Sequence, residues 1–259
     1  MHLVSLWEGP VSWLERLCVA SMLEVGHKLT IYSYRPDDLR STRLHDNVRD
    51  AREIMDEDHI SYRYIKSKRY NLFANIFRVE LQTQEKGIWV DLDCFQIQPL
   101  KNSLYTFGWV SHRKLNNAVL GLPSKADMTE DYLKGISAIP LRTPWSTWRR
   151  RTRRDIEVLL GRDIPHISVR SNIGPRALTY YAQKHNVISE ASSPEVFFPI
   201  PSKLASILVS SNNTEANSRI TENTIIAHAW QGKLKRSGLL DDRPPASSFL
   251  GMACKKLNI

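Results

Sequence analysis

The chain has 259 residues, of which 42% are hydrophobic and 24% are charged, and it carries a formal net charge of +9. This composition excludes a fibrous or disordered chain and is sufficient for the core of one large α/β domain. The chain contains no run of about 18 apolar residues, and its three cysteines are widely spaced. We therefore expect no membrane-spanning helix, no disulfide framework and no zinc site, and a cytoplasmic location.

The first half of the chain alternates between strand and helix patterns. Short apolar runs predict strands, and apolar residues at helical spacing predict helices. The predicted elements are strands at 2–7, 29–34 and 88–90, a helix at 12–25 that Gly26 ends, and a second helix from the cap Asn71 to Gly87. This order is the opening of an α/β sheet with right-handed crossovers.

The second half of the chain has weaker patterns. They predict strands at 105–111, 118–122 and 224–230, and helices at 125–134 and 174–185. Gly135 is the expected stop of the first of these helices, and Pro175 is tolerated in the first turn of the second. No linker composition interrupts the chain, so we expect one continuous domain over 1–259.

Two carboxylates follow the predicted strand at 88–90. Asp91 and Asp93 are two residues apart, so in an extended chain they face the same side, at the sheet edge where ligands of open α/β sheets bind. A hard cation such as Mn²⁺ or Mg²⁺ prefers oxygen ligands and is the usual partner of a nucleotide diphosphate. The alternative interpretation is a pair of surface turn carboxylates, because the Asp-x-Asp pattern is common.

The residues around this pair resemble a known family. Residues 73–78 (Phe-Ala-Asn-Ile-Phe-Arg) and 87–93 (Gly-Ile-Trp-Val-Asp-Leu-Asp) look like the signature of the DXD sugar transferases. This family is related to yeast initiating α-1,6-mannosyltransferase, bacterial capsular and lipopolysaccharide transferases, and clostridial glucosylating toxins. Two residues depart from its pattern: Asn75 replaces the usual Asp, and Lys86 replaces the first Gly. Donor choice therefore stays open.

The resemblance extends to three further segments, which begin at Leu6, Gly174 and Ala227. It implies that Trp7 lies against the nucleotide base, although a core aromatic is an equal alternative. It also implies that His228 contacts the metal or the diphosphate, the alternative being a satisfied histidine in a strand. Gly174 is expected at the start of a helix beside the donor.

The resemblance implies roles for the remaining candidates. Arg78 is expected to contact the donor sugar or phosphate and to pair with an aspartate, and Asn75 to hydrogen-bond a sugar hydroxyl. Asn117 is a further donor candidate, with a turn role as its alternative. The proposed catalytic residues are thus Asp91, Asp93 and Arg78, and the proposed metal ligands are Asp93 and His228, for Mn²⁺ or Mg²⁺.

The implied fold is α/β of the GT-A type, with a central, mostly parallel sheet flanked by helices. Residues 1–122 are expected to form the nucleotide-sugar-binding half, 123–236 the acceptor side and a closing segment, and 237–259 an irregular tail. The implied reaction moves a sugar from a UDP- or GDP-sugar to a hydroxyl of a glycan or a lipid-linked glycan, with retained configuration.

Two other classes of function remain open on the sequence. The aspartates could serve a glycoside or phosphate-ester hydrolase. The arginine cluster at 149–154 could belong to a basic protein that binds nucleic acid or anionic surfaces, or simply to a solvated helix face. No nucleic-acid-binding motif accompanies the cluster, so we expect acceptor recruitment or peripheral contact with an anionic membrane instead.

Overall fold

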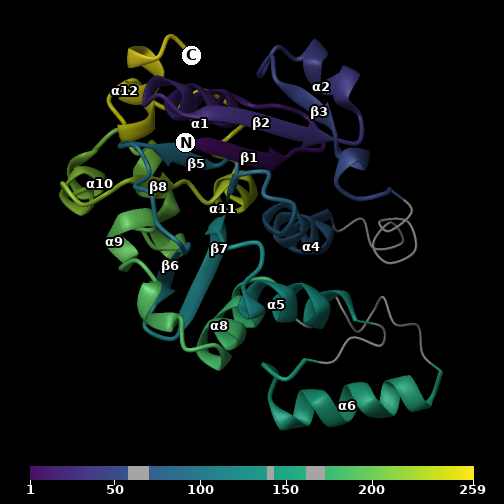
Figure 1. Ribbon diagram of the computed structural model, residues 1–259. Helices are drawn as coiled ribbons and strands as arrows, with labels where there is room; N and C mark the ends of the chain where they lie inside the picture. The colour runs from purple at the N-terminus through teal and green to yellow at the C-terminus, as the bar shows by residue number, and fades with distance from the viewer. Residues whose placement is uncertain (58–69, 139–142, 162–172) are drawn as a thin grey trace.

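The computed structural model describes residues 1–57, 70–138, 143–161 and 173–259 (Figure 1). Its centre is a six-stranded sheet in the order β3-β2-β1-β4-β7-β6. The strands are β1 (His2–Leu6), β2 (Lys28–Ser33), β3 (Val48–Asp50), β4 (Ile88–Val90), β6 (Thr106–Ser111) and β7 (Lys114–Gly121). β3, β2, β1 and β4 are parallel, whereas β7 pairs antiparallel with both β4 and β6. The predicted α/β class with a mostly parallel sheet is confirmed.

Helices cover both faces of this sheet. Successive strand residues point to opposite faces, so Leu3 packs with Met22 of α1 (Trp13–Glu24), whereas Val4 packs with Phe77 of α4 (Tyr70–Thr83). On the α4 side lie α5 (Asp127–Ser137) and α8 (Pro175–Lys184) as well, and Figure 1 shows them side by side. Both faces of the parallel strands are therefore buried, as parallel sheets require.

A second, two-stranded sheet lies beside the first and joins distant parts of the chain. β5 (Cys94–Gln96) pairs antiparallel with β8 (Ile226–His228), and Cys94 is the register partner of His228. Because β5 follows β4 after a short turn, the pairing of β5 with β8 brings residues 226–228 next to the carboxyl end of β4. The other helical segments are α2 (Pro36–Ser41), η1 (Ala51–Glu53), α6 (Trp148–Leu159), η3 (Ile188–Glu190), α9 (Pro194–Phe197), η4 (Ser202–Val209), α10 (Thr214–Arg219) and α11 (Gln231–Arg236).

The tail at 237–259 is not wholly irregular, contrary to our expectation. It contains α12 (Phe249–Lys256), in which the side chain of Ser248 caps the backbone N–H of Gly251. Leu250 and Cys254 of this helix are buried in a hydrophobic cluster that they form with residues of α1 and η4. The Pro244-Pro245 pair precedes this helix and does not prevent it.

Three predicted boundaries were also wrong. α4 begins before Asn71 and ends at Thr83, four residues ahead of Gly87. β7 begins at Lys114, four residues earlier than expected. Gly135 lies inside α5 and does not end it. A Cβ at this position would lie 1.7 Å from the Tyr181 hydroxyl oxygen of α8, so the close packing of the two helices explains why this residue is a glycine. Among the described residues, no helix is both long and apolar enough to cross a bilayer.

Candidate active site

The candidate site lies at the carboxyl end of β4. Asp91 continues the strand direction, since its backbone N–H donates to the carbonyl of Ala118 on β7 at 2.7 Å. The chain then turns at Leu92 and Asp93 and enters β5. A cavity of about 670 Å³ opens here. It is lined by seven of the eight residues predicted to form the site: Trp7, Asn75, Arg78, Asp91, Asp93, Asn117 and His228.

Asp91 is held by an aromatic and a cationic neighbour. Trp89 Nε1 donates to its Oδ1 at 2.7 Å, and Arg78 Nη2 lies 3.3 Å from the same oxygen. The guanidinium of Arg78 also stands over the Trp89 ring, 4.6 Å from the ring centroid. Burial raises the pKa of Asp91; the Arg78 cation opposes this rise, and the nearby Asp93 charge adds to it.

Arg78 is a buried cation, and backbone carbonyls fix its position. Its Nε donates to the carbonyl of Ala74 at 3.0 Å, and its Nη1 donates to the carbonyl of Asn117. Only 8% of its side chain is exposed. The ion pair with an aspartate that the resemblance implied is present, so an exposed helix arginine is excluded.

Asp93 is bound to the C-terminal part of the chain. His228 Nε2 lies 3.2 Å from its Oδ1, and the backbone N–H of Gln231 donates to its Oδ2 at 2.8 Å. Burial alone would raise the pKa of Asp93, but the His228 ring and the backbone N–H of Gln231 together bring this pKa below its usual value. For His228, burial lowers the pKa, but the Asp93 charge, the hydrogen bond with Asp93 and the Asp91 charge together raise it above its usual value. The two side chains therefore favour the ionised pair.

Three groups at this point offer atoms to a metal ion. Single ligand atoms of Asp93, Cys94 and His228 lie within 4.8 Å of one another. Burial raises the pKa of the Cys94 thiol well above its usual range, so the thiol stays neutral and is a poor ligand. Nδ1 of His228 is buried and has no hydrogen-bond partner among the residues that the structure describes. Of these three groups, the Cys94 thiol is therefore the least suited to a metal ion, and the proposed ligands Asp93 and His228 lie beside each other.

The predicted donor residues Asn75, Asn117 and Gly174 meet next to Arg78. Asn117 Nδ2 donates to Asn75 Oδ1 at 2.8 Å. A Cβ on Gly174 would lie 2.3 Å from the same Asn75 oxygen, so the side-chain pair requires glycine there. Asn117 stands inside β7, which excludes the turn role considered as its alternative. Gly174 does not line the cavity but supports the pair that does.

Trp7 and Glu8 follow β1 at the same sheet edge. Trp7 is half-buried, and its Nε1 donates to the carbonyl of Gly9 at 3.1 Å, so it lines the cavity without being enclosed in the core. Glu8 accepts hydrogen bonds from Ser33 Oγ at 3.0 Å and from the backbone N–H of Tyr34. Burial raises the pKa of Glu8.

Several residues of the cavity were missed by the sequence analysis. Gln231 donates from its side chain to Glu15, which is fully buried and also accepts from Ser12 at the start of α1. Cationic side chains of α11 also line the cavity: Lys233, Lys235 and Arg236. The basic run that follows Trp230 in the sequence was a usable signal for these cations. The Glu15–Gln231 contact had none, because it joins residues 216 positions apart.

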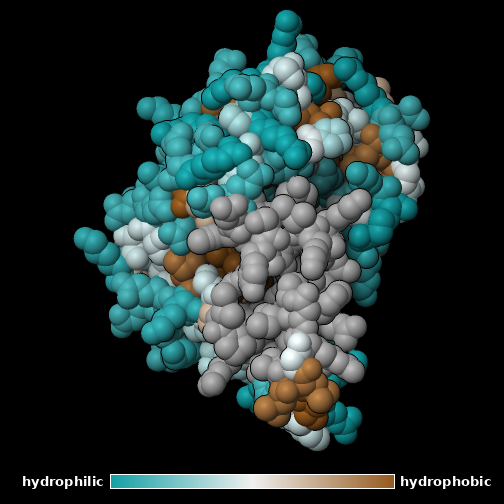
Figure 2. All heavy atoms as spheres, turned by 90° about the vertical axis from the view of Figure 1, so that its right-hand side faces the viewer, coloured by the Kyte–Doolittle hydropathy of each residue, from teal (hydrophilic) through white to brown (hydrophobic). Residues whose placement is uncertain are grey.

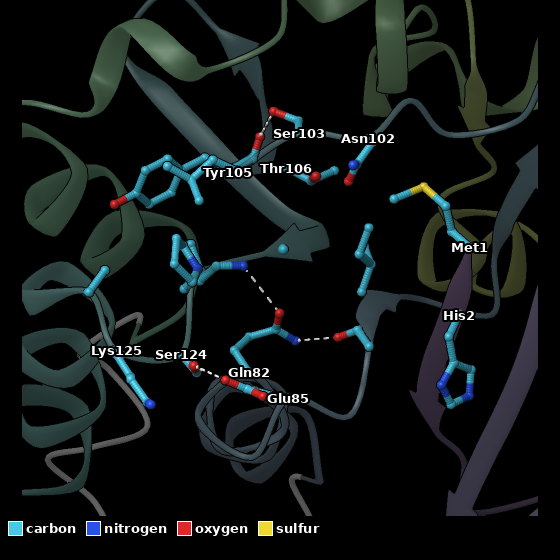
Figure 3. Close-up of a pocket in the computed structure, with 17 residues that line it drawn as sticks. Met1, His2, Gln82, Glu85, Asn102, Ser103, Tyr105, Thr106, Ser124 and Lys125 are labelled. Atoms are coloured by element: carbon cyan, nitrogen blue, oxygen red, sulfur yellow. Dashed lines mark hydrogen bonds between the residues drawn. The ribbon is translucent and has the colours of Figure 1, made fainter.

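A larger cavity, of about 1030 Å³, lies at the opposite edge of the sheet (Figure 3). It is bordered by the start of β1 at His2 and the start of β4 at Ile88. Figure 3 shows Gln82 pointing into it; this side chain bonds the carbonyl of Gly87 at 3.1 Å and the backbone N–H of Leu122 at 3.2 Å. The only carboxylate that lines it among the described residues is Glu85, which Ser124 binds. It lacks the paired carboxylates of the smaller cavity.

Comparison of the sequence with models of known protein families finds no match, and comparison with curated proteins finds none either. The chemistry of the cavity is therefore inferred from its own residues. These combine three carboxylates, a histidine, four cationic side chains and the half-buried Trp7, and all of them line one cavity.

Proposed function

We propose that this protein is a metal-dependent glycosyltransferase with a GT-A-type fold. It would move a sugar from a UDP- or GDP-sugar to a hydroxyl of a glycan or a lipid-linked glycan. The observation that carries the proposal is the meeting of Asp91, Asp93 and His228 with the cations of α11 in one cavity. Oxygen ligands opposite cations suit a divalent ion bound to a diphosphate.

The metal part of the proposal is supported by the donor set. Asp93 would hold Mn²⁺ or Mg²⁺, because carboxylate oxygens suit these ions and the lowered pKa of Asp93 keeps its carboxylate ionised. His228 would join it as a ligand only after releasing the proton that its raised pKa favours. The buried Nδ1 of His228 leaves that ring with unused bonding capacity in the described part of the chain. When bound, such an ion neutralises negative charge on a departing diphosphate.

The chain's own groups suggest how a donor would be bound. Lys233, Lys235 and Arg236 would contact phosphate oxygens through charge-assisted hydrogen bonds. Trp7 would stack on the base, and the Asn75–Asn117 amides would bind sugar hydroxyls. The volume of about 670 Å³ lies within the range of small-molecule sites, roughly 300–1000 Å³.

The fixed position of Arg78 supports the same proposal. Arg78 is held by two backbone carbonyls, so its guanidinium keeps Asp91 oriented before any ligand arrives. Preorganised charge of this kind lowers a reaction barrier because it does not need to reorient during the reaction. The retained configuration would need no protein nucleophile if the departing diphosphate helped to activate the acceptor hydroxyl.

A hydrolase is the second candidate, and one observation favours it. The pKa of Asp91 is raised by burial, whereas the pKa of Asp93 is lowered by His228. A glycosidase uses one protonated and one ionised carboxyl group in this way. Such an enzyme would release sugar from a glycoside in the presence of a chelator and would need no nucleotide.

The two candidates are separated by a melting-temperature panel of nucleotide sugars with and without Mn²⁺. A ligand at about 100 times its Kd stabilises the native state by about 2.7 kcal/mol. We expect stabilisation by a UDP- or GDP-sugar that requires Mn²⁺ and is lost in Asp93→Asn. Equal stabilisation in excess EDTA would refute the metal role, and glycoside cleavage without nucleotide would favour the hydrolase.

A further inference from the structure

α6 carries an apolar stripe that the rest of the described chain does not cover. Trp148, Ile156 and Leu159 lie on one face of the helix, with the exposed Thr152 between Trp148 and Ile156. The exposed fractions of the three apolar side chains are 65%, 51% and 85%. Leu160, directly after the helix, is 64% exposed. Four of the nine exposed large hydrophobic side chains among the described residues thus lie in this one short segment. Figure 2 shows a hydrophobic group at the lower edge of the molecule, where α6 lies in Figure 1.

Arginines border the stripe on both sides. Arg149 and Arg153 occupy the neighbouring row of the helix on one side, and Arg151 lies on the other; all three are exposed. Asp155 is also exposed and lies within the stripe, between Trp148 and Leu159. With its five arginines and two acidic residues, α6 carries a net charge of +3. Arg149 stands over the Trp148 ring, 5.4 Å from its centroid, so the cation and the aromatic ring form one surface.

The start of α6 is anchored to the body of the protein. The Trp145 ring packs on Tyr180 and Tyr181 of α8, with centroid distances of 6.1 Å and 5.9 Å. Ser146 closes a turn by donating its backbone N–H to the carbonyl of Thr143 at 2.8 Å. The stripe therefore begins at a fixed point and is presented outward along the helix.

From this arrangement we propose that α6 is a membrane-docking helix that lies in the interface of an anionic bilayer. Apolar side chains with arginines beside them match the boundary between lipid tails and negatively charged headgroups. Tryptophan favours that depth, where its ring is apolar and its N–H is hydrated. A nucleic acid would satisfy the arginines but would leave the leucine and isoleucine side chains in water, so lipid fits the whole surface better.

This inference does not depend on the chemistry of the cavity. The test is co-sedimentation of the full chain with phosphatidylcholine vesicles, with and without phosphatidylserine, at low and high salt. We expect binding to the phosphatidylserine vesicles at low salt, with a marked loss at high salt, because salt screens the arginines. No binding by the parent protein, or equal binding to both kinds of vesicle, would overturn the proposal.

Two variants separate the apolar and the cationic contributions. Trp148→Gln with Leu159→Gln should weaken vesicle binding about tenfold or more, because the apolar area that enters the bilayer is lost. Arg149→Gln with Arg153→Gln should weaken it about fivefold per removed charge at low salt. All four side chains are exposed, so folding should be preserved; Ile156→Gln with Leu160→Gln provides an independent apolar pair.

The matched control lies on α12, at the opposite end of the molecule in Figure 1. Lys255→Gln with Lys256→Gln removes two exposed charges, and Met252→Gln removes a side chain that is 41% exposed. We expect little change from either. A loss equal to that of the α6 variants would overturn the proposal, since any basic surface would then suffice. A second result would also overturn it: the parent protein binds duplex DNA or RNA but no vesicles, and Trp148→Gln with Leu159→Gln leaves that nucleic-acid binding unchanged.

Discussion

The backbone N–H of Gln231 donates to Oδ2 of Asp93 at 2.8 Å, while the side chain of Gln231 donates to the buried carboxylate of Glu15. Gln231 thus links the start of α1 to the acidic pair at the end of β4. Because Glu15 also accepts from Ser12, its carboxylate holds both the cap of α1 and the segment that carries Gln231.

Glu15→Ala should lower the free energy of unfolding by about 1–3 kcal/mol, since it removes a fully buried acceptor and leaves the half-buried donors of Ser12 and Gln231 unpaired. Urea unfolding measures this change, and Glu24→Ala, at an exposed position of the same helix, is the control. If the two substitutions cost the same, the Glu15 contacts do not stabilise the protein.

Arg78 and Asp91 should be energetically coupled. Removing one partner of a fully buried ion pair lowers the free energy of unfolding by about 3–5 kcal/mol. Because the Asp91 side chain is 29% exposed, we expect Arg78→Met to lower it by about 3 kcal/mol or less. Asp91→Asn keeps an acceptor for Trp89 Nε1 and should cost less. We expect the double variant to be less destabilised than the sum of the two single variants. Additive effects in urea unfolding would contradict the coupling.

Gly174→Ala should disrupt the Asn75–Asn117 pair. The new Cβ would lie 2.3 Å from Asn75 Oδ1, and overpacking of this kind costs about 1–3 kcal/mol. Gly232→Ala is the control, because its nearest neighbouring atom is 3.9 Å from the position of the Cβ. Thermal unfolding should show a lower melting temperature for Gly174→Ala than for Gly232→Ala. Equal melting temperatures of the two variants would mean that the Asn75–Asn117 pair can move aside without loss of stability.

Lys235→Gln with Arg236→Gln should weaken the binding of a nucleoside diphosphate. Both side chains are exposed, so each contributes about 1 kcal/mol at most, or about fivefold in affinity, and salt should reduce the difference. Titration calorimetry with UDP and GDP in Mn²⁺ measures this effect. Lys255→Gln with Lys256→Gln on α12 should leave affinity unchanged. Unaltered affinity in the α11 variant would exclude these cations from phosphate binding.

The order of strands and helices could be predicted where the cause is local. The apolar runs of β1, β2 and β4 are buried in the main sheet, and the spacing in 12–25 and 71–86 does form helices. β3 was missed because Val48 is its only apolar residue. Gly135 was misread because its cause, the Tyr181 ring, belongs to another helix. Causes that act across the chain leave no periodic pattern.

The site follows the same rule. The spacing of Asp91 and Asp93 predicted that they share one side of the chain, and the family resemblance implied that Arg78 would pair with an aspartate, which it does. The partners that orient them could not: Asn117 contributes a backbone carbonyl to Arg78, and any residue type provides that group. The resemblance implied a metal or diphosphate contact for His228, and the structure brings this side chain to Asp93. The resemblance did not indicate that Gln231 would complete the contacts of that carboxylate.

The pairing of β5 with β8 also sets the order in which the site is assembled. Asp93 and Gln231 are 138 positions apart. At about 5–20 residues per second, a ribosome adds this stretch in on the order of ten seconds. During that time the parallel strands can already associate, while Asp91 and Asp93 lack the histidine and the amide that hold Asp93. A nascent chain that stops before β8 would therefore contain most of the main sheet but would lack a complete cavity.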